Sequence, residues 1–515
     1  MEVTDFYNFA VKFLTSWYGI LFGVLAIYCT SIHIKREKFK KKHGTKEPRP
    51  YEEGGFLGLH LAYDLLRTKR AGESLDFAMG IKEKYGRTIS AKLFGLRVIG
   101  TYEPENVKAM LATQFNDFKL GRHPHFKPLL GDGIFTLDGE GWKHSRQLLR
   151  PQFVRDQVAH VSQLEPHIQT LAKHIQKNKG QTFDIQELLF RFTLDTATEF
   201  LFGESVHSLH DSSIGLSDSN EWSGFAESFD KAQRYLGTRV YSQVAYFFVD
   251  GWDFRRSVKQ VHKLAQILVQ RALAMSPEEL EEKSKNGYTF LYELAKFTKD
   301  PKILQDQSLN ILLAGRDTTA GTLSFCIFEL ARNPSIWEKL KNEVYQHFGK
   351  DYDSSKITFE SLKSCEYLKW VVNETLRLYP SVAINFRAAT KDTTLPVGGG
   401  PDGSYPIFVA KGTTVAYSYY VTQRLEEYYG KDADVFRPER WETLDKLGWA
   451  YLPFNGGPRI CLGQQFALTE ASYVIVRLVQ MFPHLETKDM REYPPKKNCQ
   501  LTVRHQDGVF IEMGV

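Results

Sequence analysis

The ten residues from 454 to 463, Phe-Asn-Gly-Gly-Pro-Arg-Ile-Cys-Leu-Gly, constrain the fold more than any other part of the chain. They carry the spacing Phe-x-x-Gly-x-Arg-x-Cys-x-Gly, and helical periodicity follows at once. Cys461 therefore stands at a helix N-terminus, where the helix dipole and free backbone N–H groups stabilise a thiolate. Gly457 and Gly463 allow a flat ligand to approach the backbone, and Arg459 can pair with its carboxylate. A lone cysteine would favour a structural loop, whereas the full spacing favours a ligand site.

The N-terminal segment from Phe13 to Ile34 is mostly apolar and contains no Asp, Glu, Lys or Arg. About 20 such residues suffice for a helix that spans a bilayer. Residues 35–42 carry six basic groups and one acid, so the positive-inside rule places the rest of the chain in the cytosol. The features of a cleaved signal peptide are not clear here. We expect residues 1–34 to form a single membrane anchor; the alternative is a buried amphipathic helix.

Composition describes an ordinary globular body. Of 515 residues, 42% are hydrophobic and 25% are charged, which excludes a disordered or fibrous protein. The net charge of +5 equals that of residues 35–42, so the body has no charge excess that would suggest nucleic-acid binding. The cysteines are scattered without a Cys-x-x-Cys pair, which argues against a disulfide framework or a zinc site of that type. They are Cys29, Cys326, Cys365, Cys461 and Cys499.

We divide the chain into three parts. The anchor is followed by a basic stop-transfer and proline linker at residues 35–50, which ends in Pro48-Arg49-Pro50. Residues 51–515 show no further linker or repeat and are expected to form one catalytic domain. Within this domain, the segment Gly54–Leu66 is apolar but too short to span a membrane. Such a segment can lie on the membrane surface.

The periodicity of the domain predicts a mainly α fold with a small β portion. Gly398, Gly400 and Gly403 spell a dinucleotide-binding motif, but Pro401 and a following strand pattern indicate a turn. The predicted elements are strands within 87–102 and 384–421, a helix that begins at Pro104, a helix over Pro301–Arg332 and a last helix over Gly463–Phe482.

The cysteine segment resembles the haem-thiolate signature of the cytochrome P-450 monooxygenases. This resemblance implies a single-domain P-450 fold with haem b as cofactor and Cys461 as the thiolate ligand of its iron. It also implies that Trp142-x-x-x-Arg146 and Arg387 hold the haem propionates together with Arg459. The cofactor-binding residues are then Cys461, Arg459, Trp142, Arg146, Arg387, Phe454, Gly457 and Gly463.

Two further segments match the family. Glu374-x-x-Arg377 would by itself be an ordinary surface ion pair, but with Arg440 it matches the buried structural network that lies behind the haem in the family. The long helix contains Ala-Gly-Arg-Asp-Thr-Thr at 314–319, where threonine hydroxyls can bond to i−4 carbonyls. The resemblance implies that Asp317 and Thr318 relay protons during oxygen activation.

Several stretches resemble the alkane- and fatty-acid-hydroxylating enzymes of alkane-assimilating yeasts. They include Leu312–Ala320, Gly131–Trp142 and Gly463–Ala471. Gln423 departs from the pattern, since relatives more often carry His before the following arginine. The resemblance implies hydroxylation of n-alkanes or fatty acids at the terminal carbon. An apolar channel would impose this selectivity, with Leu309, Leu312, Leu313, Ala383 and Ile384 as candidate walls, although plain core packing is equally compatible with each of them.

The expected protein is anchored in the endoplasmic reticulum membrane by one span, contacts membrane lipid and keeps its catalytic domain in the cytosol. Electrons should come from NADPH–cytochrome P-450 reductase, because the chain shows no convincing flavin or nicotinamide module. Two alternatives remain: a haem-thiolate isomerase or dehydratase that needs no reductant, and a non-enzymatic haem sensor or electron carrier. The intact Asp317-Thr318 pair argues against the former.

Overall fold

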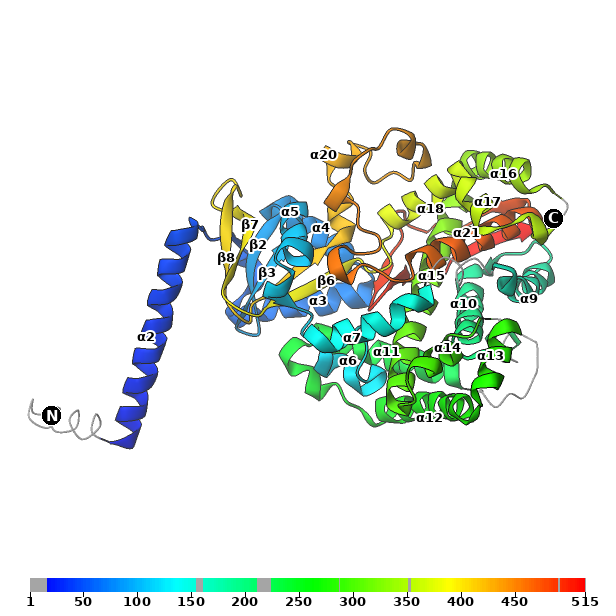
Figure 1. The fold of residues 1–515 in the computed structure, drawn as a ribbon. Helices are drawn as coiled ribbons and strands as arrows, with labels where there is room; N and C mark the ends of the chain where they lie inside the picture. The colour runs from blue at the N-terminus through cyan, green and yellow to red at the C-terminus, as the bar shows by residue number, and fades with distance from the viewer. Residues whose placement is uncertain are drawn as a thin grey trace, which may run out of the picture.

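The computed structural model describes residues 16–153, 161–210, 224–286, 288–350, 353–489 and 491–514. Helices form most of the body, and a six-stranded sheet lies at the end of the body that is nearest to the N-terminal helix (Figure 1). The predicted fold class, mainly α with a small β portion, is confirmed.

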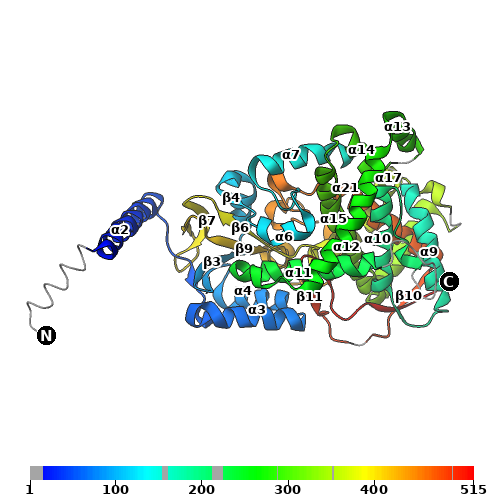
Figure 2. The ribbon, with the colours of Figure 1, turned by 90° about the horizontal axis from the view of Figure 1, so that it is seen from below.

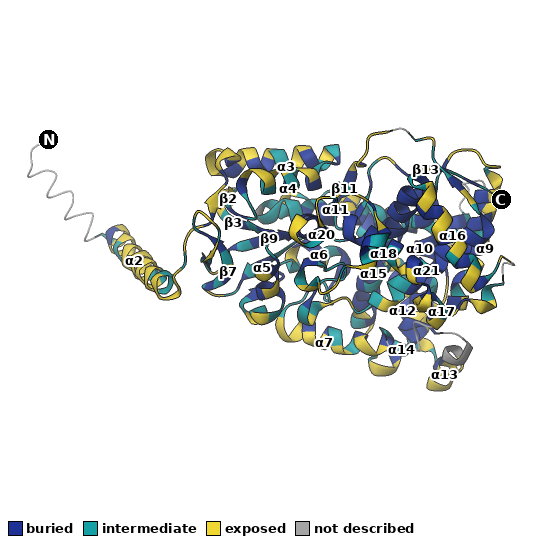
Figure 3. Cartoon of the chain, turned by 90° about the horizontal axis from the view of Figure 1, so that it is seen from above, coloured by how far each residue is buried: buried dark blue, intermediate teal, exposed yellow. Residues whose placement is uncertain are grey.

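Helix α2 (Trp17–His43) projects from the body and is the one described helix that is long and apolar enough to cross a membrane. Its most apolar window has a mean hydropathy of 1.5 and is only 6% buried, as the exposed residues along α2 in Figure 3 show. Ser16 caps its start and the left-handed Gly44 ends it. The predicted N-terminal apolar helix is therefore confirmed, while residues 1–15 of the expected anchor lie outside the described residues.

The segment predicted as a proline linker is attached to the body. Strand β1 (Arg49–Pro50) pairs in parallel with β2 (Thr88–Leu93) and forms one edge of the large sheet. An edge strand tolerates proline because its outer N–H positions need no partner strand. Helices α3 (Leu59–Ala71) and α4 (Ser74–Tyr85) lie along the sheet beside β2 (Figure 2).

The large sheet has the strand order β1-β2-β3-β9-β6-β4. It combines the two predicted strand regions, because β3 pairs in parallel with β9 and β9 pairs antiparallel with β6. The glycine-rich segment at 398–403 is the turn of the β7–β8 hairpin, as predicted, and Gly398 has a φ of 108° there. The bounds are β3 (Leu96–Thr101), β4 (Phe118–Lys119), β6 (Ile384–Ala389), β7 (Thr393–Gly399), β8 (Tyr405–Val409) and β9 (Thr414–Ser418).

Helix α15 (Pro301–Arg332) crosses the centre of the body with the predicted bounds. Asp300 caps its start by accepting a hydrogen bond from the Lys302 N–H at 2.8 Å, and the helix ends before Asn333-Pro334. Large buried clusters include apolar residues from both halves of α15. Its main partners are α10 (Ile185–Phe202), α12 (Trp252–Ala274), α18 (Glu366–Leu378) and α21 (Gln464–Met481).

The remaining elements complete the helical body and two small sheets. The other described helices of eight or more residues are α6 (His123–Leu130), α7 (Gly139–Leu149), α9 (Glu165–Lys177), α11 (Phe225–Tyr241), α13 (Pro277–Asn286), α14 (Phe290–Phe297) and α16 (Pro334–Phe348); the short α5 (Pro104–Lys108) starts at its predicted proline. The small sheets consist of β10 (His484–Glu486), β13 (Phe510–Gly514) and β5 (Phe183–Asp184), and of β11 (Lys497–Cys499) and β12 (Val503–His505).

Candidate functional site

The cysteine loop is a short, closed turn in front of α21. The Cys461 N–H donates to the Phe454 carbonyl at 3.0 Å, which closes the loop. Gly457 has a φ of 68°, and a Cβ at this position would lie 1.9 Å from the Leu111 carbonyl oxygen. This backbone contact allows only glycine. A Cβ at Gly463 would meet nothing closer than 3.7 Å in the protein, so protein packing does not require that glycine.

Cys461 keeps solvent-accessible surface, although many protein atoms surround its sulfur. Burial raises the pKa of the thiol, while the Gly463 N–H and the charge of Arg146 work in the opposite direction. The thiolate that the sequence predicts at this helix terminus stays a prediction; burial acts against it, and the Gly463 N–H and Arg146 act for it. A bound cation would restore the thiolate, because a metal ion deprotonates a coordinating thiol.

Arg459 is held beside the loop by an acid and an aromatic ring. Its Nη2 lies 2.8 Å from Asp138 Oδ1, and its guanidinium stacks 4.3 Å from the centre of the Trp142 ring. Trp142 is buried on α7, one turn before Arg146. Arg146 donates to the Ile460 carbonyl at 2.9 Å and thereby anchors the cysteine loop. The structure thus brings three predicted residues together around Cys461.

Arg387 lies on β6 and shares a partner with an arginine that the sequence did not predict. Asn385 Oδ1 accepts from Arg122 at 2.7 Å and from Arg387 at 3.3 Å. Arg122 precedes α6, and its buried Nε has no hydrogen-bond partner among the described residues. Arg122 reaches Asn385 because segments that are distant in the sequence lie together in the fold. No motif spacing connects Arg122 to the cysteine loop, so the sequence did not predict it.

Three arginines, Arg122, Arg387 and Arg459, lie together and outnumber the acids around them. Arg387 is buried and the other two are half-buried. Burial lowers the pKa of Arg459; Asp138 raises it, and the charges of Arg387 and Arg122 lower it further. Burial and the charge of Arg387 likewise lower the pKa of Arg122. Such a cluster is favourable only with anionic partners. Its donors suit a ligand that carries carboxylates, and Cys461 supplies a sulfur ligand beside it.

Glu374, Arg377 and Arg440 form the predicted network, and all three are buried. Arg377 binds Glu374 through two hydrogen bonds of 2.9 Å. Arg440 donates to Glu374 Oε1 at 2.8 Å, and the Trp441 indole donates to Glu374 Oε2 at 3.0 Å. The remaining guanidinium N–H groups of both arginines reach backbone carbonyls. The trio is a mutually satisfied structural unit.

Gln423, which departs from the yeast pattern, links this network to the cysteine loop. Its amide nitrogen donates to the carbonyls of Leu376 and Arg377 at 3.0 and 2.9 Å. Its oxygen accepts from the Leu452 N–H at 3.0 Å, two residues before Phe454. A glutamine supplies donors and an acceptor at once, so the departure from the pattern leaves the packing intact.

Asp317 and Thr318 lie in the middle of α15. Thr318 Oγ1 donates to the Ala314 carbonyl at 2.7 Å, the i−4 bond that the sequence suggested. Arg316, which also contacts Asp230 on α11, lies 3.4 Å from Asp317 Oδ1. Burial raises the pKa of Asp317, and the charge of Arg316 opposes this rise. Asp317 also lines a small cavity with Asp230 and Arg504.

The candidate channel residues differ in their surroundings. Leu309 and Leu312 are fully buried in the cluster formed with α10, α11, α12 and α14, and Ala383 is 1% exposed. Leu313 belongs to the same cluster at 9% exposure, and Ile384 on β6 is half-buried. The channel role of all five stays a prediction.

The comparisons with known proteins agree with this geometry. The sequence model of the family described as Cytochrome P450 matches residues 54–513. This chain belongs to the cytochrome P450 family. It is 60% identical to Cytochrome P450 52A13 of Debaryomyces hansenii over 97% of this chain and 98% of that one. It is 57% identical to Cytochrome P450 52A3-B of Candida maltosa over 99% of both chains, and 56% identical to Cytochrome P450 52A6 of Candida tropicalis over the full length of both.

Membership makes this P450 a haem monooxygenase. The residues present fit the haem: Cys461 offers the sulfur, and Arg122, Arg387 and Arg459 offer the surplus positive charge that two propionates require. Among the described residues no group of three or more His, Cys, Asp or Glu side chains could hold a metal ion.

Proposed function

We propose that this P450 is a membrane-anchored monooxygenase that hydroxylates n-alkanes or fatty acids at the terminal (omega) carbon. Its electrons come from NADPH through NADPH–cytochrome P450 reductase. The observation that carries this proposal is the near full-length similarity to 52A-type P450s of Candida and Debaryomyces, joined to an intact Asp317-Thr318 pair on α15. The reductase is proposed because the Cytochrome P450 model covers residues 54–513 and the sequence shows no convincing flavin or nicotinamide module.

The protein supplies binding, orientation and proton handling. When bound, the haem supplies the activation of dioxygen for insertion into a C–H bond, promoted by its thiolate ligand. Arg122, Arg387 and Arg459 orient the carboxylates of the haem, and Trp142 keeps the Arg459 guanidinium in place. Thr318 can exchange its intrahelical bond for one to a water molecule, and Asp317, whose pKa is raised, can take up and release the proton that passes along it.

Terminal selectivity has to be imposed by the protein. Terminal C–H bonds are stronger than the neighbouring secondary ones, so intrinsic reactivity favours attack further along the chain. A narrow apolar passage that admits only the chain end would reverse this preference. Leu313 and Ile384 are the candidate walls that keep some accessible surface.

Product analysis with hexadecane and with a long fatty acid tests the proposal. We expect the terminal alcohol to dominate with the unmodified enzyme, and Leu313→Ala to shift the product toward internal carbons. A majority of internal alcohols from the unmodified enzyme would overturn the terminal assignment. NADPH consumption in step with added substrate would exclude the reductant-free isomerase and the non-enzymatic sensor.

Thr318→Ala is expected to divert reducing equivalents to peroxide while the haem content stays intact. The variant loses the hydroxyl that handles protons but keeps the helix backbone. The measurement is the ratio of peroxide and product formed to NADPH consumed. Ser324→Ala is a matched control, because Ser324 makes the same i−4 bond to Ala320 at 2.6 Å in a buried part of α15. Unchanged coupling in Thr318→Ala would contradict the relay.

Membrane attachment is proposed to use α2 as a single span of the endoplasmic reticulum membrane, with the catalytic domain in the cytosol. The basic residues of the last turns of α2, Lys40, Lys41 and Lys42, support this orientation. The apolar segment at 54–66 adds a surface that can rest on lipid, since Phe56 is 80% and Tyr63 is 65% exposed.

Deletion of residues 1–42 is expected to leave a folded domain that no longer requires detergent to leave the integral membrane fraction. The deletion removes contacts such as the Arg36–Asp392 ion pair at 3.2 Å, and half-exposed pairs of this kind contribute about 0–1 kcal/mol. Membrane fractionation and haem content check the result. Firm retention in the membrane would indicate a second insertion, and Phe56→Ser with Tyr63→Ser in the shortened chain would then locate it at residues 54–66.

A further inference from the structure

The hydroxyl of Tyr417 is a buried polar group without a partner in the described protein. Tyr417 lies on β9 and is 1% exposed, and its Oη makes no hydrogen bond to any described residue. The neighbouring Tyr419 hydroxyl donates to Asn455 Oδ1 at 2.7 Å and does not reach hydrogen-bond geometry with Tyr417. Because nearly all buried polar groups of native proteins are paired, this hydroxyl indicates a partner that is not part of the chain.

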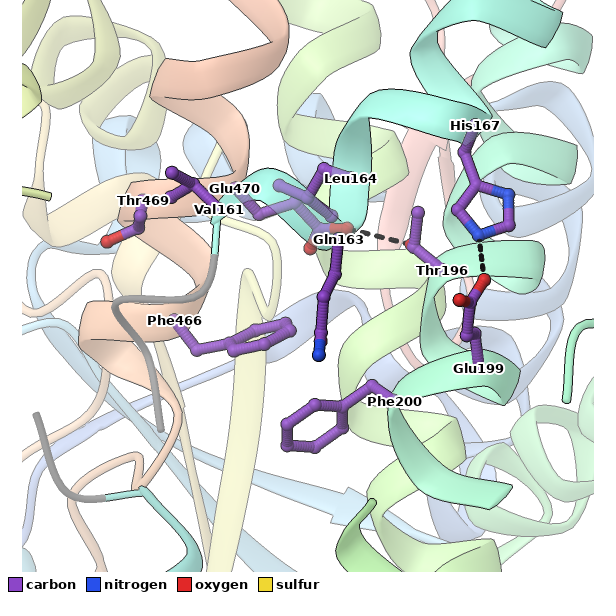
Figure 4. Close-up of a pocket in the computed structure, with 10 residues that line it drawn as sticks. All are labelled: Val161, Gln163, Leu164, His167, Thr196, Glu199, Phe200, Phe466, Thr469 and Glu470. Carbon is purple, nitrogen blue, oxygen red and sulfur yellow. Dashed lines mark hydrogen bonds and ion pairs between the residues drawn. The ribbon is translucent and has the colours of Figure 1, made fainter. Parts of the chain in front are cut away.

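A polar cavity elsewhere in the body shows the usual situation. It lies between α9, α10 and α21 (Figure 4). There the Glu470 carboxyl accepts from Thr196 at 2.9 Å, and the His167 ring pairs with Glu199. These side chains satisfy one another within the protein, so they call for no ligand. The Tyr417 hydroxyl differs from them because it is left without such a partner.

A second donor without a partner lies near Tyr417. Asn385 on β6 is directly opposite Tyr417 on β9, so their side chains are on the same face of the sheet. Asn385 accepts from Arg122 and Arg387, and the Arg387 guanidinium lies 5.7 Å from the centre of the Tyr417 ring. Burial and the charge of Arg387 lower the pKa of Arg122, whereas Tyr417 raises it, so the two side chains are within electrostatic reach. The buried Nε of Arg122, like the Tyr417 hydroxyl, has no partner among the described residues.

The acid that pairs with this group of arginines is already occupied. Asp138 accepts three hydrogen bonds, from Arg459 at 2.8 Å and from the N–H groups of Leu120 and Gly121 at 2.9 and 3.2 Å. A water molecule could accept from Tyr417, but it would not balance the positive charge of the arginines. A carboxylate accepts from both free donors and also balances charge. The chemistry of the two donors therefore favours a carboxylate.

We propose that Tyr417 is a haem-binding residue, whose hydroxyl donates to the same haem carboxylate as the Nε–H of Arg122. The inference rests on the haem that family membership implies, and it is independent of the substrate and the product. The phenol adds a hydrogen bond without adding charge. Tyr417 therefore fixes the direction of the carboxylate, while the arginines neutralise it.

Tyr417→Phe tests the proposed bond, because it removes only an oxygen that has no partner in the described protein. We expect haem to pass from the purified full-length holoenzyme to excess apomyoglobin about tenfold faster, since a hydrogen bond to a charged group is lost. The reduction potential should fall, because a less neutralised carboxylate favours ferric iron. The propionate bending band of the resonance Raman spectrum should shift, and the carbon-monoxide difference band should not.

Tyr288→Phe is the matched control. Tyr288 is also buried, but its hydroxyl donates to Gln152 Oε1 at 2.6 Å, and it belongs to a different buried cluster from Tyr417. This variant should lose stability and keep the haem release, the potential and the propionate band of the unmodified enzyme. Arg122→Lys is an independent variant if Tyr417→Phe does not fold. It keeps the positive charge but loses the Nε–H, and its haem release should rise likewise.

The double variant of Tyr417→Phe and Arg122→Lys shows whether both groups bind one carboxylate. Its haem release should rise by less than the product of the two single increases, because partners in one hydrogen-bonded network are not additive. A full product would mean that Tyr417 binds elsewhere, and would overturn the proposal. Unchanged haem release in Tyr417→Phe would overturn it too, and a shifted propionate band alone would then assign the hydroxyl to a water molecule. Because no readout here is a reaction product, these failures leave terminal hydroxylation untouched.

Discussion

Cys461→Ser is expected to abolish the carbon-monoxide difference band that is typical of a thiolate-ligated haem. A coordinating metal ion deprotonates a cysteine thiol but not a serine hydroxyl. The serine oxygen also donates less electron density to the iron than a thiolate does. The surrounding loop should persist, because its closing bond joins the backbones of residues 461 and 454 at 3.0 Å. The measurement is the reduced carbon-monoxide difference spectrum of the purified holoenzyme.

Cys29→Ser is the matched control for this substitution. Cys29 is an exposed cysteine on α2, remote from the arginine cluster, and its replacement should leave the band unchanged. Retention of the band in Cys461→Ser would mean that another residue holds the iron. Loss of the band in Cys29→Ser would instead mean that the band reports general damage to the protein.

The long helix and the sheet could be predicted because their signals are local. Asp300-Pro301 marks the start of α15 and Asn333-Pro334 its end, so both bounds follow from capping and proline chemistry. The turn at 398–403 could be distinguished from a phosphate-binding loop by equally local signals. Pro401 and the strand that follows exclude the start of a helix there. What the periodicity could not predict is that 49–50 would become the edge strand of the sheet, because strand pairing is a tertiary event.

The site was predictable only in part. The spacing around Cys461 is local, but Arg122 enters the arginine cluster through Asn385, which is more than 260 positions away in sequence. The pKa of Cys461 also depends on burial by segments that no local pattern reveals. In the same way, Glu470 looks like one more polar residue of a helix until α10 and α15 pack against it.

The Glu374 network shows how burial changes the meaning of a sequence pattern. At a spacing of i,i+3, Glu374 and Arg377 would contribute only a few tenths of a kcal/mol on a helix surface. The structure places both side chains at 0% exposure and adds Arg440 at 2%. Coulombic attraction between the charges is stronger in this buried environment than at a helix surface. Removing one partner therefore costs more stability, because it leaves a buried charge without its counter-ion.

Glu374→Gln is therefore expected to lower the free energy of unfolding by about 3–5 kcal/mol, the range for removing one partner of a buried ion pair. The amide can still accept hydrogen bonds, but it leaves the charges of Arg377 and Arg440 without their shared carboxylate. Denaturant unfolding of the full chain in detergent measures the change. Glu366→Gln, at an exposed glutamate of the same helix α18, should change stability by less than about 0.5 kcal/mol.

A graded variant separates charge loss from the loss of a single bond. Trp441→Phe keeps the aromatic packing but removes the 3.0 Å indole bond to Glu374, and a neutral donor lost to a charged acceptor costs about 1.5–3 kcal/mol. The order of stability should be Glu366→Gln, then Trp441→Phe, then Glu374→Gln. If Glu374→Gln lowers the free energy of unfolding no more than Trp441→Phe does, other groups balance the charges of the buried arginines. The Glu374 carboxylate is then not what holds α18 to the segment that carries Arg440.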